Sequence, residues 1–262
     1  MLMLTTGVQY VLPQLPQGPH PYTLSPDGRW LGFPIAGGFR LRNLTDGQTW
    51  TMADSGPGVS DAWVWSPDSA RVLVVRHTDG KVTHFDSIET ATAVRTRVVT
   101  GRSPAALLDD GTVLYWQGEA GSSPLVFADI TRGELHTLTS RTFDVAARLR
   151  AGESPIHDVL AVSPDDSQAM LTIRGPAGGS DLGLPVAVLV LNLGQGRVAE
   201  RVDLPAGADL WIPSRLLSGS IRGVQWAGGR TQVVELDRTV AAQTVVATLP
   251  GQAEVVLPGD GR

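Results

Sequence analysis

The sequence predicts an all-β fold, a single β-propeller of four-stranded antiparallel blades, with five blades favoured and six as the alternative. Three observations predict it. A strand–turn–strand unit, first seen at Tyr22–Phe33 (YTLSPDGRWLGF), recurs along the chain. The copies are spaced at about one propeller blade, which is typically about 40–45 residues. Almost no stretch shows the 3.6-residue period of an amphipathic helix.

The recurring unit is built around the turn Ser25-Pro26-Asp27-Gly28, which joins its two strands. Proline presets φ, aspartate can accept hydrogen bonds from nearby backbone N–H groups, and glycine adopts a positive φ without a Cβ clash. The residues on both sides are apolar and rich in β-formers. The unit is therefore expected to be two antiparallel strands joined by a tight turn.

Three clear copies and one degraded copy follow this unit. They are Trp63–Val75, Ala106–Trp116, Leu160–Ile173 and, without proline or aspartate in its turn, Arg215–Trp226. Counted from Ser25 through Ser66, Leu108, Ser163 and Ser218, the intervals are 41, 42, 55 and 55 residues. The longer intervals require insertions, which we place at 140–158, with a short helix over 142–150, and at 174–185.

Each copy is followed by two further expected strands, joined by turns such as Asp46-Gly47. The third strands are Phe39–Leu44, Val82–Asp86, Leu125–Ile130, Val186–Leu193 and Thr231–Asp237. The fourth strands are Thr49–Met52, Arg95–Thr100, Glu134–Leu138, Arg197–Leu204 and Thr244–Leu249. We expect one domain over 1–262, in which an N-terminal strand at 7–12 completes the last blade and closes the ring.

The Ser-Pro-Asp-Gly turn at blade spacing resembles the TolB-like family of propeller repeats. Two copies depart from the motif, because Leu108-Asp109-Asp110-Gly111 and Ser218-Gly219-Ser220 stand in its place. The resemblance implies the fold and, if a leader was removed, a partner in the periplasm or cell envelope. If residue 1 is the true start, a cytoplasmic partner is expected instead. WD-type repeats fit less well, because no copy ends in Trp-Asp.

Composition narrows the function classes. The formal net charge is −5, Lys81 is the only lysine, and no basic stripe is visible, so a nucleic-acid partner is not expected. The absence of cysteine excludes disulfides and thiolate chemistry. No apolar run approaches the roughly 18 residues that would span a bilayer. The oligomeric state is left open.

The turn acids Asp27, Asp68, Asp110 and Asp165 are interpreted as structural, because a turn acid recurs with its turn whereas a catalytic acid is normally unique. The pairs Asp109-Asp110 and Asp165-Asp166 lack the alternating spacing of a calcium loop. The five histidines, His20, His77, His84, His136 and His157, lack metal-ligand spacing. We therefore expect no metal and no cofactor.

The favoured function is a non-catalytic recognition or scaffold module that binds a protein partner. The alternative is a hydrolase or lyase that acts on a glycan in the propeller channel, with Asp61, Asp158 and Asp209 as acids at the channel mouth. Both readings rest on the predicted fold, and one propeller fold hosts many functions. Converging acids would favour the enzyme, and a channel filled by apolar side chains would favour the scaffold.

The predicted loops differ between the two ends of the propeller. Turns after the first and third strands are short, whereas several connections after the second and fourth strands are long. Long loops on a rigid scaffold are where binding residues concentrate. The candidate binding residues on these loops are His77, Asp79, Glu119, Arg150, His157, Arg174 and Asp181.

Overall fold

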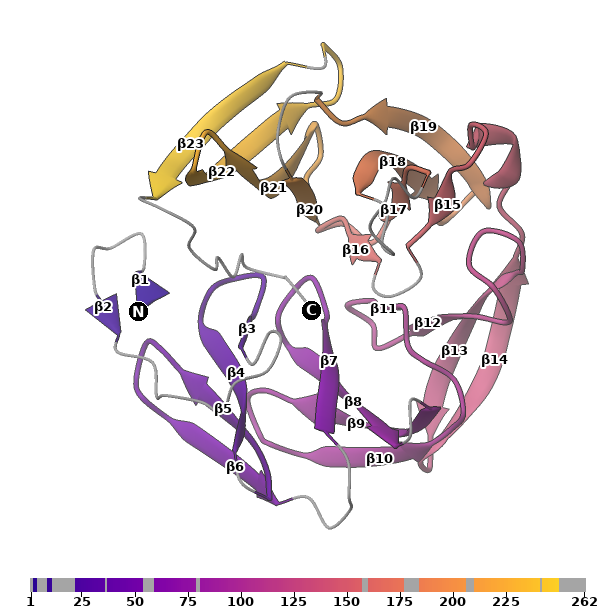
Figure 1. Ribbon diagram of the computed structural model, residues 1–262. Coiled ribbons are helices and arrows are strands. Elements are labelled where there is room, and N and C mark those ends of the chain that lie inside the picture. Colours follow the sequence, from indigo (N-terminus) through magenta and orange to yellow (C-terminus); the bar gives the residue numbers. More distant parts are fainter. Residues whose placement is uncertain are drawn as a thin grey trace.

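A computed structural model shows five antiparallel β-sheets arranged as blades around a central axis (Figure 1). It describes residues 2–3, 9–10, 22–35, 37–53, 59–78, 81–156, 160–176, 184–205, 210–240 and 242–249. The predicted five-bladed propeller is confirmed. None of the helices in these ranges is long and apolar enough to cross a membrane.

Each blade uses consecutive strands, from the inner strand near the axis to the outer one. The first blade is β3 (Thr23–Leu24), β4 (Trp30–Ile35), β5 (Gly38–Asn43) and β6 (Thr49–Ala53). The second is β7 (Val59–Trp65), β8 (Arg71–Thr78), β9 (Lys81–Glu89) and β10 (Arg95–Val99). The third is β11 (Ala106–Leu107), β12 (Val113–Trp116), β13 (Leu125–Thr131) and β14 (Glu134–Arg141).

The fourth blade has a divided inner strand. Both β15 (Ser154–Pro155) and β16 (Ala161–Val162) pair with β17 (Gln168–Arg174), at opposite ends of it. The blade continues with β18 (Pro185–Asn192) and β19 (Arg197–Asp203). The sequence predicted β16 but not β15. Its short helix over 142–150 is reduced to a 3₁₀ turn at Ala146–Arg148.

The fifth blade takes all four strands from one stretch of chain: β20 (Leu210–Leu216), β21 (Ser220–Ala227), β22 (Arg230–Asp237) and β23 (Gln243–Leu249). At the N-terminus, β2 (Gln9–Tyr10) pairs with β1 (Leu2–Met3) in a separate two-stranded sheet. The rest of the predicted strand 7–12 lies outside the described residues.

The core lies between neighbouring blades. The first two blades meet around Trp63, which is 1% exposed and packs edge-on against Phe39 with ring centroids 5.6 Å apart. Similar apolar clusters join the second blade to the third, the third to the fourth, and the fourth to the fifth. Strands such as β18 are apolar on both faces because both faces are buried against another blade.

The Ser-Pro-Asp turns share one set of hydrogen bonds. In the first turn, Ser25 Oγ donates to Asp27 Oδ1 at 2.6 Å and accepts from the Trp30 N–H at 2.9 Å. Asp27 Oδ1 also accepts from the Arg29 N–H at 2.9 Å. Ser66 with Asp68, and Ser163 with Asp165, repeat the pattern. These acids are therefore occupied in closing their own turns, as the turn interpretation predicts.

Candidate functional site

The two ends of the propeller differ in their connections. The turn face carries the turns after the first and third strands of each blade, and the loop face carries the connections after the second and fourth strands. On the loop face lie the longer described connections, 100–105, 117–124 and 142–153. The topology therefore brings His77 (end of β8), Glu119, Arg150 and Arg174 (end of β17) to the same face.

The other predicted site residues cannot be placed. Asp79, His157 and Asp181, together with the channel-mouth acids Asp158 and Asp209, lie outside the described residues. Asp61 is in β7, but its side chain is not among those described. The glycan-acting alternative therefore stays a sequence hypothesis. Within the ranges described, no group of three or more acidic or histidine side chains could hold a metal ion.

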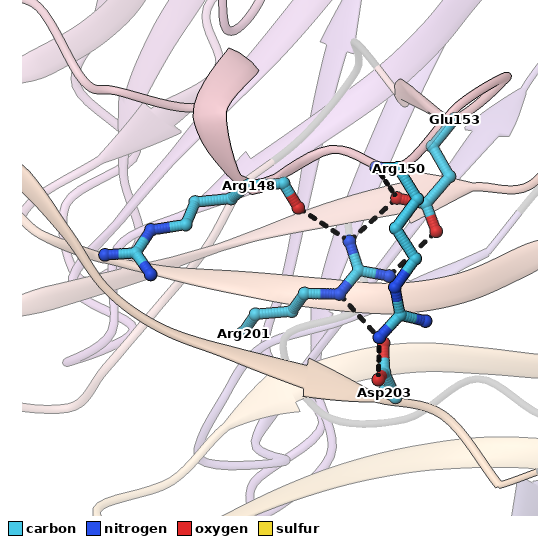
Figure 2. Close-up of polar contacts among 5 residues, drawn as sticks. All are labelled: Arg148, Arg150, Glu153, Arg201 and Asp203. Carbon is cyan, nitrogen blue, oxygen red and sulfur yellow. Dashed lines mark hydrogen bonds and ion pairs between the residues drawn. The ribbon is translucent and has the colours of Figure 1, made fainter.

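The loop at 142–153 is held against β19 by a network of charged side chains (Figure 2). Arg201 donates to both carboxylate oxygens of Glu153, at 2.7 and 2.8 Å, and to the Arg148 carbonyl at 2.8 Å. Arg201 Nε also donates to Asp203 at 2.8 Å. The side chains of Glu153 and Arg201 are only 6% and 14% exposed. Such shielded, charge-assisted bonds fix the loop more firmly than surface ion pairs would.

The pKa values in this network follow from the same contacts. Hydrogen bonds from Arg201 lower the pKa of Glu153, and the Glu153 carboxylate raises the pKa of Arg201. Arg150, a predicted binding residue, donates its backbone N–H to Glu153 at 2.7 Å and its guanidinium to Asp203 at 2.6 Å. Part of the role of Arg150 is thus to fasten the loop.

A pocket of about 380 Å³ opens on the same face between two other connections. It is lined by Gly101, Arg102, Ser103, Trp116, Gly118, Glu119 and Ala120. Trp116 is 8% exposed and also packs in the core between the third and fourth blades, so this wall of the pocket is rigid. Glu119 was predicted as a binding residue, whereas Arg102 was missed because its connection carries no recognisable motif.

Arg102 and the loop 117–124 fix the shape of the pocket. Arg102 Nη1 donates to the Gln117 carbonyl at 2.5 Å, which ties the two connections together. Ser123 Oγ donates to the Glu119 carbonyl at 2.5 Å and accepts from the Gly118 N–H at 3.0 Å. The loop is therefore closed on itself by internal hydrogen bonds.

On the turn face, acidic and serine side chains accept hydrogen bonds from backbone N–H groups of the neighbouring blade. The Asp27 N–H donates to Ser69 Oγ in the next blade at 3.0 Å, and the Asp68 N–H donates to Asp109 Oδ1 at 2.7 Å. The Asp109 N–H donates in turn to Asp166 Oδ2 at 2.8 Å. On this face, one hydrogen bond of this turn-to-turn kind therefore crosses each of the first three blade boundaries. Sequence reasoning missed this use of Asp109 and Asp166, although both are the extra acid in an Asp-Asp pair.

Two of these acids titrate abnormally. Burial raises the pKa of Asp109. Burial, together with repulsion from Asp109, Asp110 and Asp68, raises the pKa of Asp166 to about 6. Oδ1 of Asp166 is buried without a hydrogen-bond partner among the described residues. The carboxylates of Asp109 and Asp166 on the turn face therefore link neighbouring blades.

Comparison with known proteins supports the fold. No protein-family model matches this sequence, and no curated protein matches it. Among solved structures, a protein assigned as TolB from Agrobacterium tumefaciens has 17% identity and a TM-score of 0.55, covering 92% of this chain and 86% of that one. Hydrazine synthase from Kuenenia stuttgartiensis has 16% identity and a TM-score of 0.52, covering 92% and 70%.

TolB from Acinetobacter baumannii has 16% identity and a TM-score of 0.51, covering 92% of this chain and 55% of that one. This chain thus spans about half of that protein. At these identities the similarity shows that this chain shares the propeller fold of the TolB structures. It does not show a shared function, because one fold hosts many functions.

Proposed function

We propose that this protein is a non-catalytic recognition propeller that binds a macromolecular partner, most simply a protein, through its loop face. The observation that carries the proposal is the difference between the two faces. On the turn face, Asp27, Asp68 and Asp165 are engaged in closing turns, and Asp109 and Asp166 link blades. On the loop face, ion pairs fix loop 142–153, and a formed pocket is lined by the exposed side chains of Arg102 and Glu119.

The arrangement fits recognition because the loop face is preorganised. Loop 142–153 is fastened by Arg201 and Glu153, and loop 117–124 by Ser123 and Arg102. A surface that is already ordered loses less conformational entropy on binding than a flexible one does. Propellers whose blades pack as a rigid core are suited to presenting such a surface.

The experiment compares changes on the two faces. Replacing 176–184, between β17 and β18, with a two-residue Asn-Gly turn should preserve folding and weaken capture of a partner from host extract. Inserting three residues in the Thr131–Gly133 turn, on the turn face, should leave capture intact. Circular dichroism establishes that both variants fold. Loss of capture only in the turn-face variant would overturn the proposal.

A further inference from the structure

The pocket at 101–103 and 116–120 brings together two opposite charges that do not neutralise each other. Arg102 and Glu119 are both exposed and both line the pocket, yet they form no ion pair. Ion pairs elsewhere on this face, such as Arg201 with Glu153, have N–O distances of 2.7 Å. The two charges in the pocket are therefore separated and available to a ligand.

The Arg102 side chain is held in place by one hydrogen bond, but most N–H donors of its guanidinium have no partner among the described residues. One Nη1 N–H binds the Gln117 carbonyl, and the backbone N–H of Arg102 binds Thr100 Oγ1 at 3.1 Å. A guanidinium has five N–H donors, so four remain without a partner in the described part of the chain. Because its partner is a neutral carbonyl, the positive charge is uncompensated. A carboxylate is the group that this planar fork binds best.

Glu119 is positioned by its backbone rather than by its side chain. Its carbonyl accepts from Ser123 Oγ and from the backbone N–H groups of Ser122 and Ser123. Its carboxylate has no hydrogen-bond or ion-pair partner among the residues described. An ammonium group in the pocket would therefore meet a carboxylate that does not have to break another bond first.

The rest of the pocket is apolar or small. Trp116 forms a wall, Ala120 is buried beside it, and Gly101 and Gly118 add no side chains. Indole faces attract both apolar groups and cations. The volume of about 380 Å³ is at the lower end of the range for small-molecule sites, roughly 300–1,000 Å³.

We infer that this pocket binds a short free peptide, its terminal carboxylate on Arg102 and its terminal ammonium on Glu119, with the intervening side chain against Trp116. The two charges are further apart than in an ion pair, because Arg102 and Glu119 form none among the described residues. A dipeptide likewise keeps its two terminal charges apart, at about 3.5 Å per extended residue. This site needs no macromolecular partner, so the present inference and the proposed function can fail independently.

The test is isothermal titration calorimetry of the purified protein with alanyl-leucine, its N-acetyl form and its C-terminal amide. We expect alanyl-leucine to bind and each blocked form to bind about tenfold more weakly, because each lacks one charge-assisted contact. Arg102→Gln and Glu119→Gln should each weaken binding of alanyl-leucine by about the same factor.

Matched control variants are Arg42→Gln and Glu134→Gln, exposed charges on β5 and β14 outside the pocket. They should bind alanyl-leucine as the unmodified protein does, and all four variants should keep the same melting temperature within a few degrees. The inference is wrong if alanyl-leucine does not bind. It is also wrong if the blocked forms bind equally well, or if either pocket variant retains full affinity.

Discussion

The backbone N–H of Asp109 donates a 2.8 Å hydrogen bond to Oδ2 of Asp166, across the boundary between the third and fourth blades. The equivalent turn position is proline in three other copies, Pro26, Pro67 and Pro164, and proline has no N–H to donate. The departure of the third copy from the Ser-Pro-Asp pattern therefore provides a contact that the regular motif cannot make.

The first prediction concerns pH. Because the folded pKa of Asp166 is raised to about 6, the folded protein binds a proton that the unfolded chain releases near 3.8. Stability should therefore rise as pH falls from about 7 to 5, and Asp109 should contribute in the same direction. Asp166→Asn should remove most of this dependence. It should also raise the free energy of unfolding at pH 7 by on the order of 1 kcal/mol after solvent screening, and with it the melting temperature.

Asparagine suits this test because position 166 has a φ of 55°, which asparagine tolerates, and because its amide oxygen can still accept from Asp109. Melting temperatures between pH 4.5 and 7.5 provide the measurement. Asp46→Asn, in another exposed turn, is the control. An unchanged pH profile in Asp166→Asn would show that Asp166 is ionised normally.

The second prediction concerns the recurrent turns. Asp27→Ala and Asp68→Ala each remove a carboxylate that accepts from a serine hydroxyl and a backbone N–H. Each should lower the free energy of unfolding by about 0.5–2 kcal/mol in urea titration and leave partner capture unchanged. A variant as stable as the parent that no longer captures a partner would make the turn acids a binding site.

The third prediction concerns a buried charge. Asp86, on β9, is 0% exposed and accepts from Arg95 at 2.5 Å and from Arg97 at 3.0 Å. Burial raises its pKa, but the two arginines outweigh burial and lower it overall. Asp86→Ala should destabilise the protein by about 2–4 kcal/mol, because two partly covered cations lose their partner. Urea unfolding measures the loss, and an effect under about 0.5 kcal/mol would contradict this account.

The fourth prediction concerns loop 142–153. Glu153→Gln keeps the shape of the side chain but weakens both bonds from Arg201, so hydrogen exchange in this loop should accelerate while exchange in β12 and β13 stays unchanged. Because the folded pKa of Glu153 is lowered, the parent should show the same loosening as pH falls below about 4.5. Equal acceleration throughout the fourth blade would instead indicate general destabilisation.

Much of the fold could be predicted from the sequence, because its determinants are local. The Ser25–Gly28 turn predicts a hairpin from four adjacent residues. Apolar, β-forming runs between turn residues placed most predicted strand ends within a few residues of the observed ones. The exceptions are informative. Strand β15 has only two residues, and residues 142–150 pack Phe143 and Val145 into the core with just one 3₁₀ turn. Tertiary contacts, rather than local propensity, decide both.

The candidate site was less predictable, because its contacts join distant parts of the chain. Arg201 meets Glu153 from 48 residues away, and Asp109 meets Asp166 from 57. Glu119 was expected on the loop face, and in the structure it lines the pocket on that face. Its neighbour Arg102 belongs to the connection before the same blade, and no pattern in the sequence links the two.

The three hydrogen bonds that join the recurrent turns of neighbouring blades run in one direction, from a backbone N–H in the earlier blade to an acceptor in the later one. During synthesis on the ribosome, the second, third and fourth blades therefore each supply the acceptor for an N–H group that the preceding blade has left without a partner. A chain interrupted after its third blade would expose both the Asp109 N–H and an apolar sheet face. Such nascent fragments should be substrates for chaperones until the fourth blade, which ends at Asp203, has been translated.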